Sequence, residues 1–335
     1  MRGGRTGHNN AEPVFMLGCP RSGTTLLASH LGRHPDVLAL PETHFFPGSY
    51  GGNALSRARA QRDPARFFEY IWTRNPRIQD VSIDPMALRE DFVAQGIHDA
   101  RAALDLIFAH ALKGTGKRRI LEKTPRHIEQ IDRILRWYPR AKILCVARDG
   151  RDVVNSLIDA PWTHSNAARH TALWRWCTQV SLDRAARHPD RVKVVQYERF
   201  VSDPEASLRE ICAFIGTPYD AAMLDSSIRT DTAPEWEKAW KGTATMAADT
   251  SALFKWRHHA DPALMARREG IMRAELAALN LPLTGAPAAR APLRWSRPVF
   301  RLTHALRNAL LTHVIHRSGA FRTRKPNPTK GADAA

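Results

Sequence analysis

Short apolar runs alternate along the chain with longer segments of helical periodicity. The apolar runs have the length of buried strands and are bounded by proline, glycine or charged residues; they cover 13–18, 37–40, 119–121, 142–147 and 191–196. The segments between them place apolar residues at helical spacing; they cover 24–34, 127–138, 150–158, 166–187 and 203–215. Strands that alternate with helices predict an α/β fold, in which helices cover both faces of a central parallel sheet.

Three regions depart from this alternation. Residues 48–113 are rich in arginine and poor in strand signals, so we expect a helical insertion there. The polar, glycine-rich start predicts a flexible N-terminus over 1–12, and the main domain then covers 13–285. Residues 286–335 predict a basic C-terminal extension, with an amphipathic helix at 299–316 and a disordered end.

Composition places the chain among ordinary globular proteins. Its 335 residues are 43% hydrophobic and 25% charged, which excludes wholesale disorder. No apolar run is long enough to span a bilayer, and the N-terminus lacks the apolar core of a signal peptide. The four cysteines are far apart and form no CxxC pair, which argues against a zinc site or a disulfide framework and fits a reducing cytoplasm.

Charge is unevenly distributed. The formal net charge is +17, and the extension 286–335 carries ten lysines and arginines against the single acid Asp333. A basic body suits an anionic ligand such as a nucleotide. A basic tail suits nucleic acid, an anionic membrane surface or plain solubility, and docking of its helix on the protein's own surface gives the same pattern.

A phosphate-binding loop is predicted between the first apolar run and the first helix. The segment Gly18-Cys19-Pro20-Arg21-Ser22-Gly23-Thr24-Thr25 has the spacing of a Walker loop, but Thr24 replaces the lysine. The N–H groups at the start of the helix and the helix dipole would favour an anion there, and Gly23 allows close approach. A missing lysine, with no strand ending in a magnesium-binding aspartate, predicts a phosphate-type anion held without a dedicated metal.

These residues resemble the sulfotransferases that use 3′-phosphoadenosine 5′-phosphosulfate (PAPS). PRSGTTLL is similar to the family's 5′-phosphosulfate loop, which implies donor contacts from Arg21, Ser22, Gly23, Thr24 and Thr25. The segment KILCVARDGRDVVNSLI resembles the 3′-phosphate motif, which implies that Arg148 and Ser156 hold the 3′-phosphate; an ion pair of Arg148 with Asp149 or Asp152 is the alternative. Tyr197-Glu198 resembles the Tyr-Glu segment after a core strand, with a structural or nucleotide-binding role. The resemblance implies a P-loop-type three-layer fold.

The closest motifs are those of the tyrosylprotein and heparan sulfotransferase branches, in which a glutamate deprotonates the acceptor. Glu42, just past a short strand, matches that position, and its apolar neighbours would make it a better base. His127 is the competing base, although a solvent-facing histidine at a helix start is its ordinary interpretation. Lys123 resembles the branch's active-site lysine; pairing with Glu122 is the alternative. If the segment is extended, His44 points to the side opposite Glu42.

The expected activity is transfer of a sulfuryl group from PAPS, with Glu42, Lys123 and Arg21 as catalytic residues and no metal. The acceptor would be a hydroxyl or an amine of a peptide, glycan, lipid or small molecule. An ATP-dependent P-loop phosphotransferase and a non-catalytic nucleotide- or nucleic-acid-binding protein are the alternatives. We expect a cytoplasmic protein, with peripheral membrane contact only through the basic C-terminal helix, and no specific nucleic-acid partner.

Overall fold

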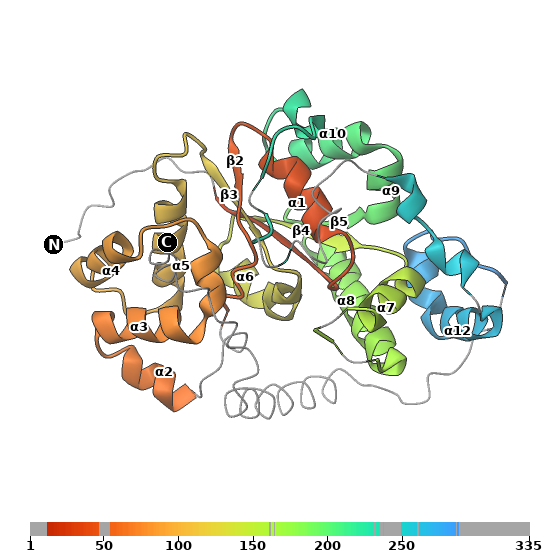
Figure 1. Cartoon of the computed structure of the whole chain (residues 1–335), viewed down its shortest axis with the longest axis horizontal. Coiled ribbons are helices and arrows are strands. Elements are labelled where there is room, and N and C mark those ends of the chain that lie inside the picture. The colour runs from red at the N-terminus through yellow and green to blue at the C-terminus, as the bar shows by residue number, and fades with distance from the viewer. Residues whose placement is uncertain are drawn as a thin grey trace, which may run out of the picture.

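A five-stranded parallel sheet forms the centre of the computed structural model, which describes residues 12–46, 54–285 and 287 apart from short gaps at 161, 164, 231, 235–236, 238–248 and 260 (Figure 1). The strands are β1 (Val14–Gly18), β2 (Val37–Ala39), β3 (Arg119–Lys123), β4 (Lys142–Ala147) and β5 (Val192–Gln196). Their spatial order is β2-β3-β1-β4-β5, so β1 lies in the middle and pairs with β3 and β4. The predicted parallel sheet is confirmed.

Side chains of β1 alternate between two separate hydrophobic cores, as the pleat of a strand requires. Phe15 and Leu17 belong to one core, and Val14 and Met16 belong to the other. All four side chains are at most 1% exposed, so β1 is buried on both faces. A central strand of this kind is read in sequence as a continuous apolar run.

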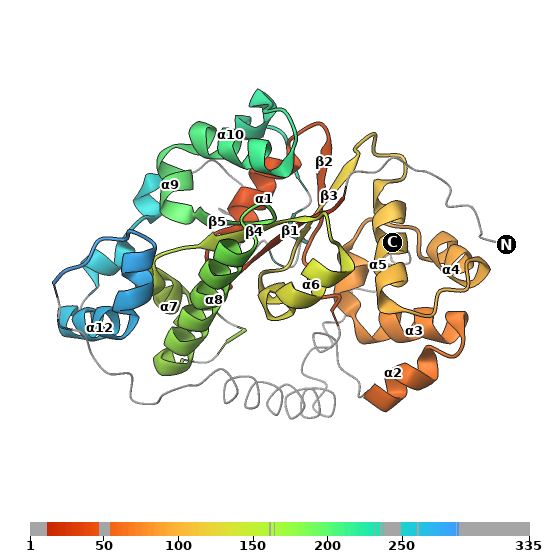
Figure 2. The same cartoon turned by 180° about the vertical axis from the view of Figure 1, so that it is seen from behind.

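Helices cover both faces and make three layers (Figures 1 and 2). The face of Val14 is covered by α1 (Thr24–Gly32), α9 (Tyr197–Ser202) and α10 (Pro204–Ile215). The face of Phe15 is covered by α6 (Ile131–Trp137), α7 (Gly150–Ile158) and α8 (Ala167–Arg187). The predicted three-layer α/β architecture is therefore confirmed.

The predicted insertion consists mainly of helices over its described residues, from residue 54 onward. It holds α2 (Ala54–Ala60), α3 (Pro64–Arg74), a 3₁₀ turn (Pro76–Asp80), α4 (Pro85–Ala94) and α5 (Ala100–Leu112), gathered at one end of the sheet (Figure 1). Asp63, Asp84 and Asp99 cap α3, α4 and α5 by accepting backbone N–H groups of the first turn. Phe108 of α5 lies 6.3 Å from Phe15, ring centroid to ring centroid, and joins the insertion to the sheet core.

Some elements differ from the sequence prediction. The helix expected over 127–138 starts as a 3₁₀ turn (Pro125–Gln130) and becomes α-helical only in α6. Two helices were not predicted: α9, and α12 (Pro262–Ala278) at the end of the molecule opposite the insertion (Figure 1). The buried face of α12 includes the charged residues Arg268, Glu269 and Glu275, which hide its amphipathic pattern.

Several predictions concern residues outside the described ranges. These are the flexible N-terminus up to residue 11 and, from residue 288 onward, the basic extension with its helix at 299–316. The cytoplasmic location and the membrane contact of that helix remain predictions. Within the part of the chain that the structure describes, no helix is both long enough and apolar enough to cross a bilayer.

Candidate functional site

The candidate residues lie at one edge of the sheet, where all five parallel strands have their carboxyl ends. Open α/β sheets bind ligands at this edge. The phosphate loop follows β1, Glu42 follows β2, Lys123 ends β3, Arg148 follows β4 and Tyr197 follows β5. Because β1 is central, the loop lies between the Glu42 side and the Arg148 side of the edge.

The phosphate loop connects β1 to α1 through two left-handed residues. Arg21 has φ 73° and Gly23 has φ 91°, and the Ser22 N–H donates to the Cys19 carbonyl over 3.2 Å. The first N–H groups of α1 have no acceptor within their own helix. The Ser22 hydroxyl oxygen is buried without a hydrogen-bond partner in the structure. A bound anion would satisfy such donors.

Gly23 lies against the ring of Tyr197 and fixes how closely the loop approaches β5. A Cβ added at Gly23 would lie 2.2 and 2.3 Å from two ring carbons, so only glycine fits. The same ring also contacts Arg148, whose guanidinium carbon lies 4.6 Å from the ring centroid. Tyr197 is thus a buried support between the two predicted anion-binding segments.

Arg21 and Ser156 connect these two segments directly. The Arg21 Nε donates to the Ser156 Oγ over 2.9 Å, although the residues are 135 positions apart in the sequence. Burial, and then the charge of nearby Arg148, lower the pKa of Arg21. Two guanidiniums that repel each other in a half-buried place would both gain from an anion between them.

Several buried groups hold the Arg148 backbone. The Trp174 indole Nε1 donates to the Arg148 carbonyl over 2.9 Å, and Gly150 is packed against the same indole. The Arg148 side chain is 3.6 Å from the Asp152 carboxylate, so the alternative ion pair does form. Asp149 instead binds the buried Arg151 over 2.7 Å.

Glu198 is a buried acid on the Arg148 side of the edge. Its Oε1 accepts the Asp149 backbone N–H over 2.8 Å, and its Oε2 is buried without a hydrogen-bond partner. Burial raises the pKa of Glu198 to about 7, against the opposing effect of the Asp149 N–H. Sequence analysis named this residue only as part of a Tyr-Glu segment, and its titration near neutrality comes from tertiary burial.

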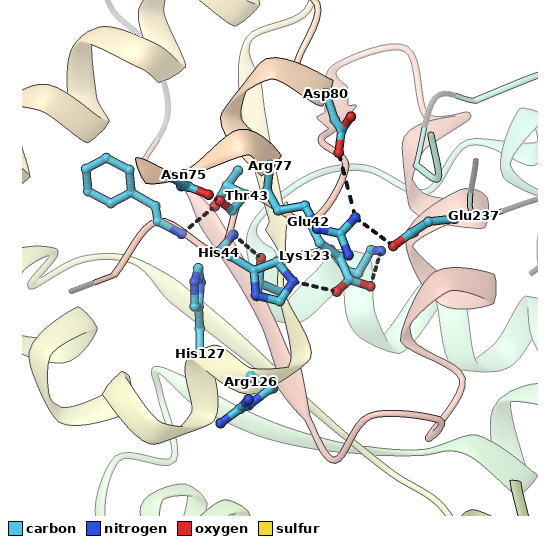
Figure 3. A network of polar contacts seen from close by, with 12 residues as sticks. Glu42, Thr43, His44, Asn75, Arg77, Asp80, Lys123, Arg126, His127 and Glu237 are labelled. Atoms are coloured by element: carbon cyan, nitrogen blue, oxygen red, sulfur yellow. Dashed lines mark hydrogen bonds and ion pairs between the residues drawn. The ribbon is translucent and has the colours of Figure 1, made fainter. Parts of the chain in front are cut away.

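Glu42 is held by a lysine and a histidine on the other side of the phosphate loop (Figure 3). The Lys123 Nζ lies 3.1 Å from Glu42 Oε1, and the His44 Nε2 lies 3.2 Å from Glu42 Oε2. The Lys123 side chain is 0% exposed and that of Glu42 is 13% exposed. Buried ammonium and carboxylate groups compensate each other, while Glu42 remains open to a small extent.

Two expectations about this cluster, and one alternative, were wrong. Lys123 does not pair with Glu122, because neighbouring residues of β3 point to opposite faces of the sheet. His44 does not point away from Glu42: residues two apart in an extended segment share a side, and the left-handed backbone at His44, with φ 46°, turns the imidazole further toward the carboxylate. His127 does not face solvent: its side chain is 0% exposed and its Nδ1 lies 3.0 Å from Glu122 Oε2.

The insertion and the segment before α12 also reach this cluster. Arg77, on the 3₁₀ turn of the insertion, lies 3.0 Å from Glu237 and 3.7 Å from Asp80 (Figure 3). Burial lowers the pKa of His44, and the charge of Arg77 lowers it further. Sequence analysis missed Arg77 and Glu237, which are 160 positions apart and lie in no recognisable motif.

The structure therefore brings together the predicted residues in two groups around the loop. Ser156, Arg148 and Tyr197 lie on one side, Glu42 and Lys123 lie on the other, and Arg21 of the loop itself bonds to Ser156. Cations suited to phosphate or sulfate thus lie beside a carboxylate that can accept a proton. Across the described ranges, no three His, Cys, Asp or Glu side chains are grouped as metal ligands.

Comparisons with known proteins agree with this architecture. A family model described as "Sulfotransferase family" matches residues 13–221. Protein-tyrosine sulfotransferase 1 of Danio rerio is 26% identical over 234 residues, covering 66% of this chain and 60% of the relative. Nodulation protein NoeE of Sinorhizobium fredii is 27% identical over 235 residues, covering 63% of this chain and 51% of the relative.

Among solved structures, the sulfotransferase domain of a Synechococcus olefin synthase superposes with a TM-score of 0.60 at 20% identity, covering 84% of this chain and 100% of that domain. The sulfotransferase domain from the curacin biosynthetic pathway gives 0.57 at 17% identity, covering 82% and 99%. These two structural similarities show that the chain has the fold of these sulfotransferase domains. The chain spans 60% of the Danio protein and 40% of a Drosophila melanogaster protein-tyrosine sulfotransferase. Since the family model matches well over half of its length, the chain belongs to the sulfotransferase family.

Proposed function

We propose that this chain transfers a sulfuryl group from PAPS to a hydroxyl or an amine of an acceptor, with Glu42 as the general base. The observation that carries the proposal is the Glu42–Lys123 pair, at the sheet edge beside the phosphate loop. Family membership supports the transferase chemistry. The missing loop lysine, replaced by Thr24, argues against the ATP-dependent phosphotransferase alternative.

The residues present fit a donor that carries two separate anionic groups. The N–H groups at Gly23, Thr24 and Thr25, the orphan Ser22 hydroxyl and Arg21 would hold the 5′-phosphosulfate. Arg148 and Ser156 would hold the 3′-phosphate, with Tyr197 supporting both regions. When bound, PAPS supplies the sulfuryl group and becomes adenosine 3′,5′-bisphosphate.

The structure favours Glu42 over His127 as the base. Glu42 is partly exposed, whereas His127 is fully buried and its Nδ1 is engaged by Glu122. Glu42 would take the proton of the attacking hydroxyl or amine. Lys123 and Arg21 would place positive charge where negative charge develops on the departing phosphate; removal of one such donor costs on the order of a hundredfold in rate.

The acceptor can be a peptide, a glycan, a lipid or a small molecule. Similarity to protein-tyrosine sulfotransferases makes a phenolic hydroxyl the first one to assay. The test measures transfer of labelled sulfate from PAPS to panels of these acceptors, together with calorimetric binding of adenosine 3′,5′-bisphosphate and of ATP with Mg²⁺. Tight binding of the bisphosphate without metal and measurable transfer are expected; preference for ATP with Mg²⁺ would overturn the proposal.

Glu42→Gln assigns the base. The variant should bind the bisphosphate as wild type does and lose turnover by about a hundredfold or more, since general-base catalysis contributes roughly that much. Glu205→Gln is the matched control, because Glu205 forms an exposed ion pair with Arg209 on α10. An unchanged rate in Glu42→Gln would mean that another group is the general base, and the activity of His127→Gln would then be measured.

A further inference from the structure

We propose that His44 is a positioning residue that acts through Glu42: its neutral imidazole donates a hydrogen bond to one carboxylate oxygen while Lys123 holds the other. This inference rests on the proposed function, because it assigns His44 to the reaction for which Glu42 is the base. The carboxylate would be kept in one rotamer, and its basicity would depend on whether the imidazole is neutral or charged.

Lys123 and His44 differ in exposure and in charge. The Lys123 side chain is 0% exposed and is 3.1 Å from Oε1, so this contact is a buried ion pair. The His44 side chain is 22% exposed and is 3.2 Å from Oε2. Lys123 therefore pairs with the carboxylate out of contact with solvent, whereas His44 can exchange a proton with solvent.

The backbone at His44 is arranged to bring the imidazole back to Glu42. In an extended segment, residues 42 and 44 would point to the same side but lie about 7 Å apart, while their neighbour would point to the other side. The left-handed φ of 46° at His44 instead folds the chain so that the two side chains meet. A non-glycine residue in this conformation costs of order 1–2 kcal/mol and persists only where its surroundings hold it.

Those surroundings are visible on both sides of His44. The His44 N–H donates to the Thr124 Oγ1 over 3.3 Å, and the Asn75 Nδ2 donates to the Thr43 carbonyl over 2.8 Å. The Thr43 hydroxyl in turn donates to the buried Glu122 over 2.8 Å. Asn75 and Thr43 are at most 1% exposed. The turn at His44 is therefore fixed by buried bonds.

The charged groups that face the imidazole set its protonation. Glu42 faces it from the same segment, Arg77 from the insertion and His127 from the turn after β3, and Lys123 lies beyond Glu42. Burial, which is the largest effect, and the charges of Arg77 and His127 lower the pKa of His44 more than Glu42 raises it. The imidazole is therefore neutral at neutral pH, and the contact with a carboxylate assigns the Nε2 proton to the donor role.

Acidification has a defined consequence. When His44 gains a proton, a second positive charge lies against Glu42. The carboxylate then takes the proton of the substrate hydroxyl or amine less readily. Turnover should then fall on the acid side. Because the pKa of His44 is lowered, this fall belongs below the usual histidine value of 6.5.

The kinetic experiment compares three variants in the full chain. His44→Phe removes the donor, His44→Gln keeps a donor that does not titrate, and His110→Gln is the control. His110 forms a similar pair with Asp91, over 2.8 Å, within the insertion. Turnover and KM for donor and acceptor are measured from about pH 5 to about pH 9, a range that brackets histidine titration.

We expect His44→Phe to lower kcat by about ten- to a hundredfold, as misplacement of a reacting group does, with KM for PAPS unchanged. His44→Gln should keep kcat within about threefold of wild type at high pH and should change the acid side of the profile. His110→Gln should behave as wild type. Wild-type kcat and pH profile in His44→Phe, or equal losses in His44→Gln and His44→Phe, would overturn the inference.

A second measurement does not require activity. The titration of the His44 ring is followed by NMR in the wild type and in Glu42→Gln. Because Glu42 raises the pKa of His44, its neutralisation should move the midpoint to lower pH. Equal midpoints would refute the pairing. Absence of PAPS-dependent transfer in the wild type would instead refute the proposed function and leave this titration informative about the pair.

Discussion

Gly23→Ala tests whether the phosphate loop is held by its contact with Tyr197. A Cβ at this position would lie 2.2 Å from one ring carbon and 2.3 Å from another, so the ring or the loop must move. The same ring lies under the Arg148 guanidinium, whose carbon is 4.6 Å from the ring centroid. One added methyl group should therefore disturb both anion-binding segments.

The expected magnitude has two parts. Alanine at φ 91° costs about 1–2 kcal/mol in backbone energy, because left-handed conformations are unfavourable for L-residues. Forcing a carbon against a packed ring costs a further 1–3 kcal/mol or so, the usual range for overpacked cores. The free energy of unfolding should thus fall by about 2–5 kcal/mol, and affinity for adenosine 3′,5′-bisphosphate by at least about tenfold.

Gly216→Ala is the matched control. Gly216 ends α10 with φ 72°, but a Cβ there would have no heavy atom within 4 Å. It should therefore cost only the backbone part, about 1–2 kcal/mol, and leave bisphosphate binding unchanged.

Urea unfolding and titration calorimetry measure both quantities, and a double-mutant cycle isolates the clash. In a Tyr197→Ala background the ring is absent, so Gly23→Ala should no longer cost the 1–3 kcal/mol or so that comes from overpacking. The cycle should therefore give a coupling free energy of about 1–3 kcal/mol. Two results would refute the reasoning. One is a Gly23→Ala variant no less stable than Gly216→Ala that binds the bisphosphate normally; the other is a cycle with no coupling.

Two further predictions concern buried charge. Burial lowers the pKa of His30 to about 4, although the hydrogen bond to the Met223 carbonyl opposes this shift. The folded state therefore favours the neutral ring. This contribution to the free energy of unfolding is complete above the unfolded pKa of 6.5 and is lost as the pH falls through about 4. A pKa shift is worth about 1.4 kcal/mol per pH unit. In urea unfolding measured as a function of pH, the free energy of unfolding should therefore fall on acidification by about 3 kcal/mol less in His30→Asn than in wild type. Glu269→Gln should lower the free energy of unfolding by roughly 3 kcal/mol, because its partner Arg151, 2.6 Å away, is 0% exposed and would be left buried with less compensation. The control Glu205→Gln removes an exposed ion pair and should lower it by under about 1 kcal/mol. The first expectation would be contradicted if His30→Asn and wild type had the same dependence of stability on pH. The second would be contradicted if Glu269→Gln and Glu205→Gln lowered the free energy of unfolding equally.

Sequence patterns predicted the central architecture because β1 and β4 are buried on both faces and therefore appear as continuous apolar runs. The phosphate loop was also predictable, since its spacing and its place between a strand and a helix are local properties. The helix α10 carries its own start and end signals, with Asp203 as N-cap and Gly216 in a left-handed C-cap. Local signals of this kind are independent of the rest of the fold.

Features that depend on tertiary contacts were not predictable. The helix α12 buries Arg268, Glu269 and Glu275, and a charged buried face looks like an exposed one in sequence. Burial of His127 follows from its bond to Glu122, five residues earlier on β3, and no rule of periodicity indicates it.

Strand order explains why the candidate residues could be predicted individually but not which of them lie together. Alternating strands and helices place every candidate residue at the carboxyl edge of the sheet, but they do not say which strands are neighbours. The observed order inserts β3 between β2 and β1, and this alone brings Lys123 beside Glu42, 81 positions earlier. It also leaves β4 on the far side of β1, so Arg148 and Glu42 flank the phosphate loop from opposite sides. A donor with anionic groups at two ends, held by the loop and by Arg148, would then have its reacting end next to the Glu42 side.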